Sequence, residues 1–218
     1  MFRPIERFRK LVRAIDPGLA RRRKIVAETP QVKLADRHVA ACRLVTDRAA
    51  MLRLLPQGAV VAELGVASGR FSAQILARTK PATLVLVDLW DSNRYDDGLR
   101  VVREKFADQI ADGTIEIRRG YSTEQLAQFP DGHFDWVYID TDHSYRTTIA
   151  ELELAAAKVR PGGLICGHDF TAGNAVAPVV YGVIQACGKF CADHGWRYKY
   201  LSFETSGLFS FCLEKIPD

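Results

Sequence analysis

Residues 60–72, VVAELGVASGRFS, contain the pattern that decides the fold. An apolar, β-branched run over 60–65 enters a segment with glycines at 65 and 69, and an amphipathic stretch over 70–79 follows. This order predicts a buried strand, a tight turn and a helix. In a parallel sheet such a turn lies at the carboxyl edge, where α/β proteins bind their ligands.

The alternation of strand and helix continues along the chain. Two late runs, Trp196 to Phe203 and Leu208 to Leu213, are joined by only four residues, which permits only an antiparallel pair. Alternating units favour a parallel sheet with helices on both faces. We therefore predict a doubly wound α/β fold: a mostly parallel, seven-stranded sheet with a C-terminal antiparallel hairpin, preceded by N-terminal helices. Strands are predicted at 60–65, 83–89, 115–119, 134–139 and 163–166, and helices at 70–79, 96–111, 122–128, 144–159 and 177–193.

The N-terminal segment is more basic than the rest of the chain. Residues 1–24 hold nine Lys and Arg against two acidic residues, 9 − 2 = +7, so residues 25–218 carry +4 − 7 = −3. Such a segment suits packing on the body or on a second subunit, the interpretation we favour, or contact with an anionic membrane surface or nucleic acid. No motif for DNA or RNA binding supports the last of these.

Apolar residues recur at spacings of three and four in this segment, which indicates an amphipathic helix interrupted around Asp16-Pro17-Gly18. A second helix is predicted over 32–55, with a break near Thr46-Asp47. We predict two parts: a basic helical extension over 1–55 and a main domain over 56–218.

Composition narrows the class of protein. The 218 residues are 48% apolar and 26% charged, as in one ordinary globular domain. Five cysteines without a C-x-x-C pair favour a reduced protein, and the cytoplasm is the expected compartment. We expect no targeting segment or membrane span, because no run is long and apolar enough.

The glycine pattern of the first turn is E-x-G-x-x-x-G, which differs from the G-x-G-x-x-G of dinucleotide sites. A carboxylate at Glu63 would repel a pyrophosphate but would attract an ammonium group. Helix-start amides and Ser72 would hold a carboxylate. We therefore expect a ligand with an amino-acid end.

The next predicted strand ends at Asp88, 88 − 69 = 19 residues after Gly69. A carboxylate at this place can accept both hydroxyls of a ribose. Leu89 and Trp90 follow and would lie against a purine. An amino acid, a ribose and a purine together describe S-adenosylmethionine.

These motifs, together with the Arg160-Pro161-Gly162-Gly163 turn, resemble those of the class I methyltransferases over about residues 59–214. Further segments resemble the catechol-type O-methyltransferases, and more closely short bacterial methyltransferases of sugar and natural-product modification. These segments are Gly120-Tyr121-Ser122, residues 138–145 and Gly167-His168-Asp169-Phe170. The resemblance implies a Rossmann-like methyltransferase fold. It also implies that Gly65, Ala67, Gly69 and Ser72 line the methionine end, that Asp88 binds the ribose, and that Gly120, Tyr121 and Ser122 edge the adenine.

The resemblance also implies a catalytic group. Asp140 stands where the family has its first metal ligand, while His168 and Asp169 replace an Asp-Asn pair that completes a magnesium site. An imidazole at His168 favours zinc, manganese or iron over magnesium. Three roles therefore remain for His168: ligand of a divalent metal, hydrogen-bonding residue, or second base. His143 replaces a lysine that takes the acceptor's proton. An imidazole near its ordinary pKa of about 6.5 suits that work, although His143 could instead hydrogen-bond its loop. Asp142 is expected to cap the following helix.

The sequence thus favours an S-adenosylmethionine-dependent methyltransferase that acts on a hydroxyl of a small molecule such as a sugar, phenol or natural product. Two alternatives remain: a nicotinamide-dependent oxidoreductase, and a non-catalytic binding module that docks through its basic arm. A homodimer is expected, because little chain is left to enclose the acceptor.

Overall fold

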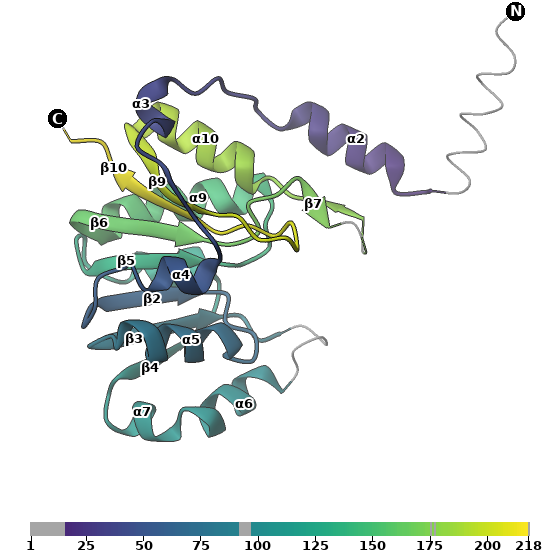
Figure 1. The fold of residues 1–218 in the computed structure, drawn as a ribbon. Coiled ribbons are helices and arrows are strands. Elements are labelled where there is room, and N and C mark those ends of the chain that lie inside the picture. The colour runs from purple at the N-terminus through teal and green to yellow at the C-terminus, as the bar shows by residue number, and fades with distance from the viewer. Residues whose placement is uncertain (1–15, 92–96, 175, 177, 218) are drawn as a thin grey trace, which may run out of the picture.

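The computed structural model describes residues 16–91, 97–174, 176 and 178–217. A single large sheet crosses the molecule, and helices lie on both of its faces (Figure 1). The strands are β1 Arg43–Val45, β2 Val60–Leu64, β3 Thr83–Asp88, β4 Ile115–Arg119, β5 Phe134–Ile139, β6 Val159–Gly167, β7 Gly173–Asn174, β8 Val179–Val180, β9 Trp196–Ser202 and β10 Phe211–Lys215. The helices are α2 Leu19–Glu28, α3 Asp36–Val39, α4 Arg48–Leu52, α5 Arg70–Thr79, α6 Gly98–Lys105, α7 Ala107–Ala111, α8 Ser122–Ala127, α9 Tyr145–Lys158 and α10 Val183–His194.

The eight strands of the large sheet follow the order β1-β9-β10-β6-β5-β2-β3-β4. Strand β10 runs antiparallel to both of its neighbours, and the other pairings are parallel. The order reverses at β2, whose neighbours are β3 and β5. The predicted fold class and C-terminal hairpin are confirmed, with one strand more than the seven expected.

Two apolar cores hold the layers together. On one face, side chains such as Leu126 of α8, Leu152 of α9 and Phe190 of α10 pack on the sheet. On the other face, Leu52 of α4 and Phe71 of α5 do the same. The central strands are buried on both faces, as expected of a doubly wound sheet.

The eighth strand corrects the prediction for the N-terminal segment. A helix was expected over 32–55, but the structure has α3, then β1, then α4. Strand β1 pairs with β9, which would otherwise be an edge strand. The hydrogen bonds gained by the backbone of β9 outweigh the helical preference of the three residues Arg43–Val45. The expected break is real: the Asp47 carboxylate accepts from the Ala50 amide at 2.6 Å and begins α4. The division at residue 55 stays a prediction, although β1 lies in the main sheet.

Two other predicted helices differ from the structure. The stretch 96–111 forms α6 and α7, which are separated at Phe106, while residue 96 lies outside the described residues. The stretch 177–193 begins with β8, which pairs with β7, and only then becomes α10. Residue 177 is also outside the described part of the chain.

The structure describes the basic arm only from residue 16, so the predicted amphipathic helix before the interruption at Asp16 lies outside the described residues. Helix α2 begins after Gly18, as the predicted interruption requires, and none of its residues is buried. It extends beyond α10, on the side where the β7–β8 ribbon lies (Figure 1). Within the described ranges, no helix has the length and hydropathy needed to cross a bilayer.

A glycine inside α10 tests how tightly this face is packed. At Gly188 an added Cβ would meet no atom within 4 Å, so Gly188→Ala should raise the free energy of unfolding by about 0.5–1 kcal/mol, the usual helical preference. At Gly195, which ends the same helix with φ +67°, alanine should lower stability by about 1 kcal/mol. Urea unfolding measures both changes, and a loss of stability in Gly188→Ala would contradict the open environment of this residue.

Candidate functional site

The turn after β2 touches the end of β5. Gly65 has φ +88°, and a Cβ built there would lie 1.9 Å from the carbonyl oxygen of Asp140. The Asp140 amide also donates to the carbonyl of Leu64 at 2.8 Å. Only glycine lets the turn pass this close, so Gly65 brings the predicted cofactor turn and the predicted catalytic loop together.

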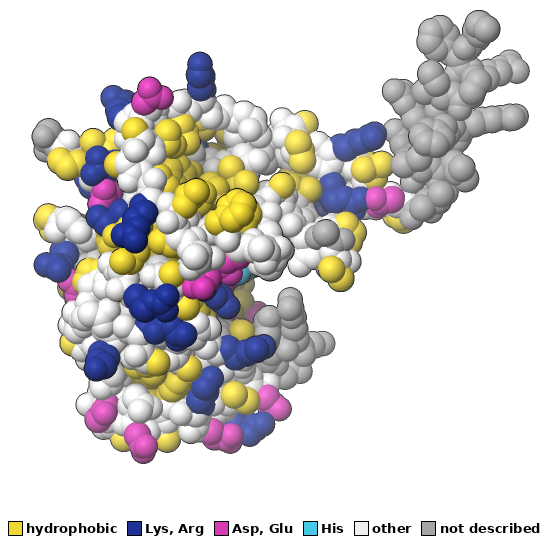
Figure 2. All heavy atoms as spheres, viewed as in Figure 1, with side chains coloured by type: hydrophobic (Ala, Val, Ile, Leu, Met, Phe, Trp, Pro, Cys, Tyr) yellow, Lys and Arg dark blue, Asp and Glu magenta, His cyan; other side chains and the backbone are white. Residues whose placement is uncertain are grey.

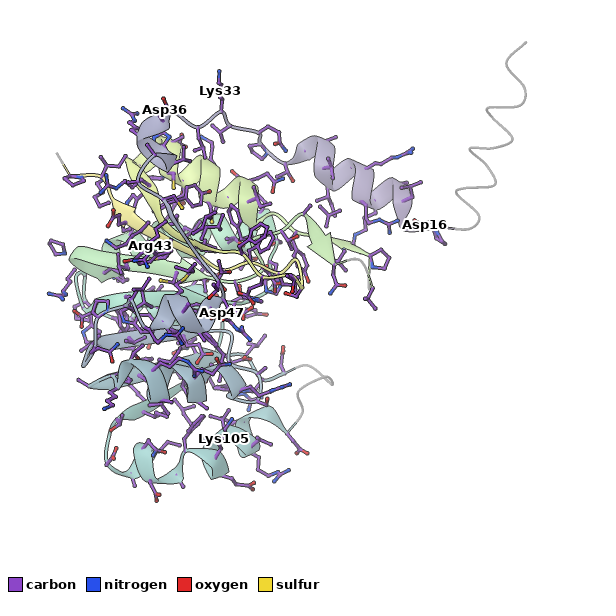
Figure 3. The ribbon with its side chains drawn as sticks, viewed as in Figure 1. Asp16, Lys33, Asp36, Arg43, Asp47 and Lys105 are labelled. Atoms are coloured by element: carbon purple, nitrogen blue, oxygen red, sulfur yellow. The ribbon has the colours of Figure 1, made fainter. Side chains whose placement is uncertain are left out.

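The second glycine of the turn is held by α6. Gly69 has φ +67° and precedes α5, and its carbonyl accepts a hydrogen bond from Lys105 Nζ at 2.8 Å. Figure 3 shows Lys105 on α6, below the sheet. The sequence analysis did not single out Lys105, because nothing in a helix of mixed charge indicates which lysine reaches a turn 36 residues earlier.

Asp88 lies at the end of β3 and supports the same turn. One carboxylate oxygen accepts from the Val66 and Ala67 amides, and the other from the Trp90 amide, each at 2.8 Å. A carboxylate offers about four lone-pair sites, so the oxygen with one donor can still receive a hydroxyl. The ribose role stays a prediction, but Asp88 also fixes the shape of the turn.

Trp90 contributes to the turn in a different way from that expected. Its side chain is 5% exposed, and its indole N–H donates to the carbonyl of Ala67 at 2.8 Å. A buried indole has no free face, so the expected contact of Trp90 with a purine is not supported. Leu89, which is partly exposed, remains available for that contact.

Beneath the turn lies a pair of unpaired buried polar groups. Glu63 is 1% exposed and Ser72 is fully buried, and neither Glu63 Oε2 nor Ser72 Oγ has a hydrogen-bond partner among the described residues. Burial raises the pKa of Glu63 to about 8, against the opposing effect of the nearby Ser72 hydroxyl. Buried polar atoms normally have partners, so this pair is suited to a polar ligand group in the turn.

The loop after β4 lies next to Asp88. The Gly120 amide donates to the carbonyl of Asp88 at 3.0 Å, and the Tyr121 side chain is 60% exposed. The Ser122 hydroxyl donates to a carboxylate oxygen of Glu151. The structure thus brings the predicted adenine loop to the predicted ribose residue. Ser122 is held by its hydrogen bond to Glu151 of α9.

The predicted catalytic residues meet where β5 and β6 end. His143 Nε2 lies 3.1 Å from Asp140 Oδ1 and 3.0 Å from Asp169 Oδ2. His168 Nδ1 is farther away, 3.6 Å from Asp169 Oδ2 and 4.0 Å from Asp140 Oδ2. His143 and Asp169 have φ angles of +61° and +52°, which non-glycine residues seldom adopt. The loops are therefore held in strained conformations that point these side chains at one another.

The two carboxylates change the acid-base behaviour of His143. Burial lowers its pKa, but hydrogen bonds from His143 to Asp140 and Asp169 and the charges of both carboxylates raise it to about 9. The same contacts lower the pKa of Asp169 despite its burial. The expectation that the pKa of His143 stays near 6.5 is therefore wrong: without a metal, the imidazole is protonated at neutral pH.

These side chains also suit a metal ion. Ligand atoms of Asp140, His143 and Asp169 all lie within 4.8 Å of one another. Two carboxylates and an imidazole favour zinc, manganese or iron over magnesium. His143 takes the place in this set that was expected for His168, which lies just outside it. Asp142 does not join this set, because it accepts from the Ser144 amide and the Thr147 hydroxyl, each at 2.8 Å. The N-cap of α9 is Ser144 rather than the expected Asp142: the Ser144 hydroxyl accepts from the Thr147 amide at 3.2 Å.

Glu151 is a residue that the sequence analysis missed. It lies on the sheet-facing side of α9 with Thr148, Leu152 and Ala155, and it is fully buried. An acidic residue directly before Leu152 and four residues before Ala155, in a predicted helix, was a visible signal in the sequence.

An apolar groove of about 310 Å³ lies between the segment over 31–42, α10 and β9. Among the residues that line this groove, only Phe170 is a sequence neighbour of the cluster, since it follows Asp169. Apolar side chains are visible around α3 at this place in Figure 2.

The close approach at Gly65 leads to a stability prediction. Gly65→Ala should lower the free energy of unfolding by about 3 kcal/mol or more, because the methyl group overlaps the Asp140 backbone. Gly58 is the matched control: its φ is +64°, but no atom lies within 4 Å of an added Cβ. Gly58→Ala should therefore cost only about 1–2 kcal/mol. Equal losses in urea unfolding would contradict the close approach.

The raised pKa of His143 predicts a pH dependence of stability. Its stabilising effect should be complete below pH 6.5 and should be lost as pH rises through about 9, since the folded state holds this proton more tightly. The change is at most about 3 kcal/mol. We expect His143→Gln to remove this part of the slope when unfolding is measured from pH 6 to 10 in EDTA. An unchanged slope would show that His143 titrates normally.

Comparison with known proteins identifies the family. The family model described as a methyltransferase domain matches residues 62–170, which is 109 of the 218 residues. This range runs from β2 to Phe170, so it covers the glycine turn, Asp88 and the Asp140 cluster. A search of curated protein sequences found no match.

Solved structures share the fold. Cofactor-bound Rv0187 from MTB is 21% identical with a TM-score of 0.59, over 92% of this chain and 90% of that one. A SAM-dependent methyltransferase from Aquifex aeolicus is 12% identical with a TM-score of 0.58, over 89% and 98%. The pyocyanin biosynthetic protein PhzM is 15% identical with a TM-score of 0.55, over 77% of this chain, which spans only 54% of PhzM.

At these identities the structural likeness concerns the fold, while the family match concerns the residues that form the site. With the glycine turn, Asp88 and the strand order, both lead to one conclusion. The chain belongs to the methyltransferase-domain family and is a class I S-adenosylmethionine-dependent methyltransferase.

Proposed function

We propose that this methyltransferase transfers the methyl group of S-adenosylmethionine to a hydroxyl of a small molecule. The observation that carries the proposal is the cluster of Asp140, His143 and Asp169, which begins at the residue touched by the glycine turn. A proton-accepting cluster beside a cofactor turn suits an acceptor that must lose a proton as it attacks.

The cofactor would lie along the carboxyl ends of β2, β3 and β4. Its ammonium group would approach Glu63, and its ribose would reach the free side of Asp88. The unpaired oxygen of Glu63 supports this placement, since an ammonium group would satisfy it and favour the ionised carboxylate. The methionine carboxylate would lie at Ser72 and the amides that begin α5.

The chemical step needs alignment more than activation. The sulfonium already carries the positive charge that drives displacement, so the protein must hold the acceptor oxygen in line and remove its proton. His143 is the proposed base. With a pKa of about 9 only about 1% of it is neutral at pH 7, but that neutral form is a stronger base than an ordinary imidazole.

A divalent metal would fit the same residues. Asp140, Asp169 and His143 would hold it, with His168 beside them, and its charge would polarise the acceptor hydroxyl. In that case His143 would be a ligand instead of the base. Metal dependence stays a proposal, as does the assignment of oxygen as the methyl acceptor.

The size of the groove and the charge of the chain also favour a small-molecule acceptor. The groove near α10 falls within the range of pockets that bind small organic ligands. Residues 25–218 carry a net charge of −3, which does not favour binding to a polyanion. The family match does not support the nicotinamide alternative, and the homodimer stays a prediction.

Calorimetric titration with S-adenosylhomocysteine tests the cofactor site. The wild type should bind in the micromolar range, and Asp88→Asn should bind at least about tenfold more weakly, because it loses charge-assisted hydrogen bonds. Asp108→Asn on the exposed side of α7 is the control and should bind as the wild type does. Absence of binding by the wild type, or a rise in melting temperature with NAD⁺ instead, would contradict the proposal.

A further inference from the structure

Glu151 hydrogen-bonds two loops that come from strands far apart in the sheet. Its Oε1 accepts from the hydroxyl of Ser122, at the end of the loop after β4. Its Oε2 accepts from the hydroxyl of Thr141 at 2.9 Å, in the loop after β5. Strands β2 and β3 lie between β5 and β4, so the sheet itself does not join these loops.

Burying the carboxyl group of Glu151 costs desolvation free energy. The residue is fully buried and forms no salt bridge with a Lys or Arg of the described segments. Burial raises the pKa of Glu151 to about 7, while the Ser122 and Thr141 hydroxyls oppose the rise. An apolar side chain would avoid this desolvation, so packing alone does not explain an acidic residue here.

The two loops serve different halves of the proposed reaction. The loop ending at Ser122 begins with Gly120, which binds the backbone of Asp88 at the ribose position. Thr141 lies between Asp140 of the acid-base cluster and Asp142, which accepts from the amide of Ser144, the N-cap of α9. One carboxyl group therefore joins the cofactor side of the site to the acceptor side.

We propose that Glu151 is a positioning residue that couples the adenosine-binding loop to the loop carrying Asp140 and His143. The inference rests on the proposed function, because it assigns the first loop to the cofactor. Glu151 acts through Ser122 and Thr141 and touches neither reactant. Loss of the bridge releases both loops, so cofactor affinity falls even though the residues facing the cofactor are unchanged.

Substitutions at one position separate this role from simple packing. Glu151→Leu removes both acceptors, whereas Glu151→Gln can still accept from one hydroxyl and donate to the other. We expect Glu151→Leu to weaken binding of S-adenosylhomocysteine about tenfold or more, and Glu151→Gln to stay within about threefold. Glu153→Leu, an exposed position on the same helix, is the matched control and should bind as the wild type does.

A double-mutant cycle tests the coupling itself. Thr141→Val should weaken S-adenosylhomocysteine binding in the wild type and have no further effect in Glu151→Leu, because the hydrogen bond is already lost. Additive effects would overturn the coupling. If Glu151→Leu does not fold, the cycle is run with Thr141→Val and Ser122→Ala, which leave the carboxyl group in place and should again be non-additive.

The outcomes distinguish this inference from the proposed function. If the wild type binds S-adenosylhomocysteine and a folded Glu151→Leu variant binds it with the same affinity, only the positioning role is overturned. A lower melting temperature of the variant does not change this conclusion. Failure of the wild type to bind S-adenosylhomocysteine overturns both.

Discussion

The site depends on one backbone contact, the passage of Gly65 across the carbonyl of Asp140. Because no side chain fits between them, the cofactor turn after β2 and the acid-base loop after β5 are built as one unit. Asp88 and Trp90 then fix the far side of the turn through hydrogen bonds to its backbone. The reversal of strand order at β2 puts this contact where doubly wound sheets leave a crevice.

Electrostatics around this contact follow from burial and from pairing. Glu63 is fully buried, so its pKa rises, and a cationic ligand group would reverse that effect. His143 lies partly buried between two carboxylates, and its pKa rises for the opposite reason: its charged form is the stabilised one. The free site therefore holds protons at both places at neutral pH, and binding of cofactor or metal must change that state.

The sequence was sufficient for the features that depend on local pattern. The strands around Leu64 and Val87, helix α5 and the C-terminal hairpin come from periodicity and short turns. Contacts between distant residues were not readable. Strand β1 exists because β9 offers an edge. The pKa of His143 is raised by Asp140 and also by Asp169, which is 26 residues away in sequence. Trp90 was assigned to a purine because the strand register does not reveal that its indole turns back to Ala67.

The central claim is that one edge of the sheet holds the cofactor so that its sulfur faces His143. A crystal structure with S-adenosylhomocysteine tests this most directly. The account predicts the amino-acid end over the Gly65–Gly69 turn and the sulfur about 6 Å from His143 Nε2, with room for one methyl group and one acceptor oxygen. S-adenosylhomocysteine bound in the groove beside α10, or its sulfur turned away from Asp140 and His143, would contradict it.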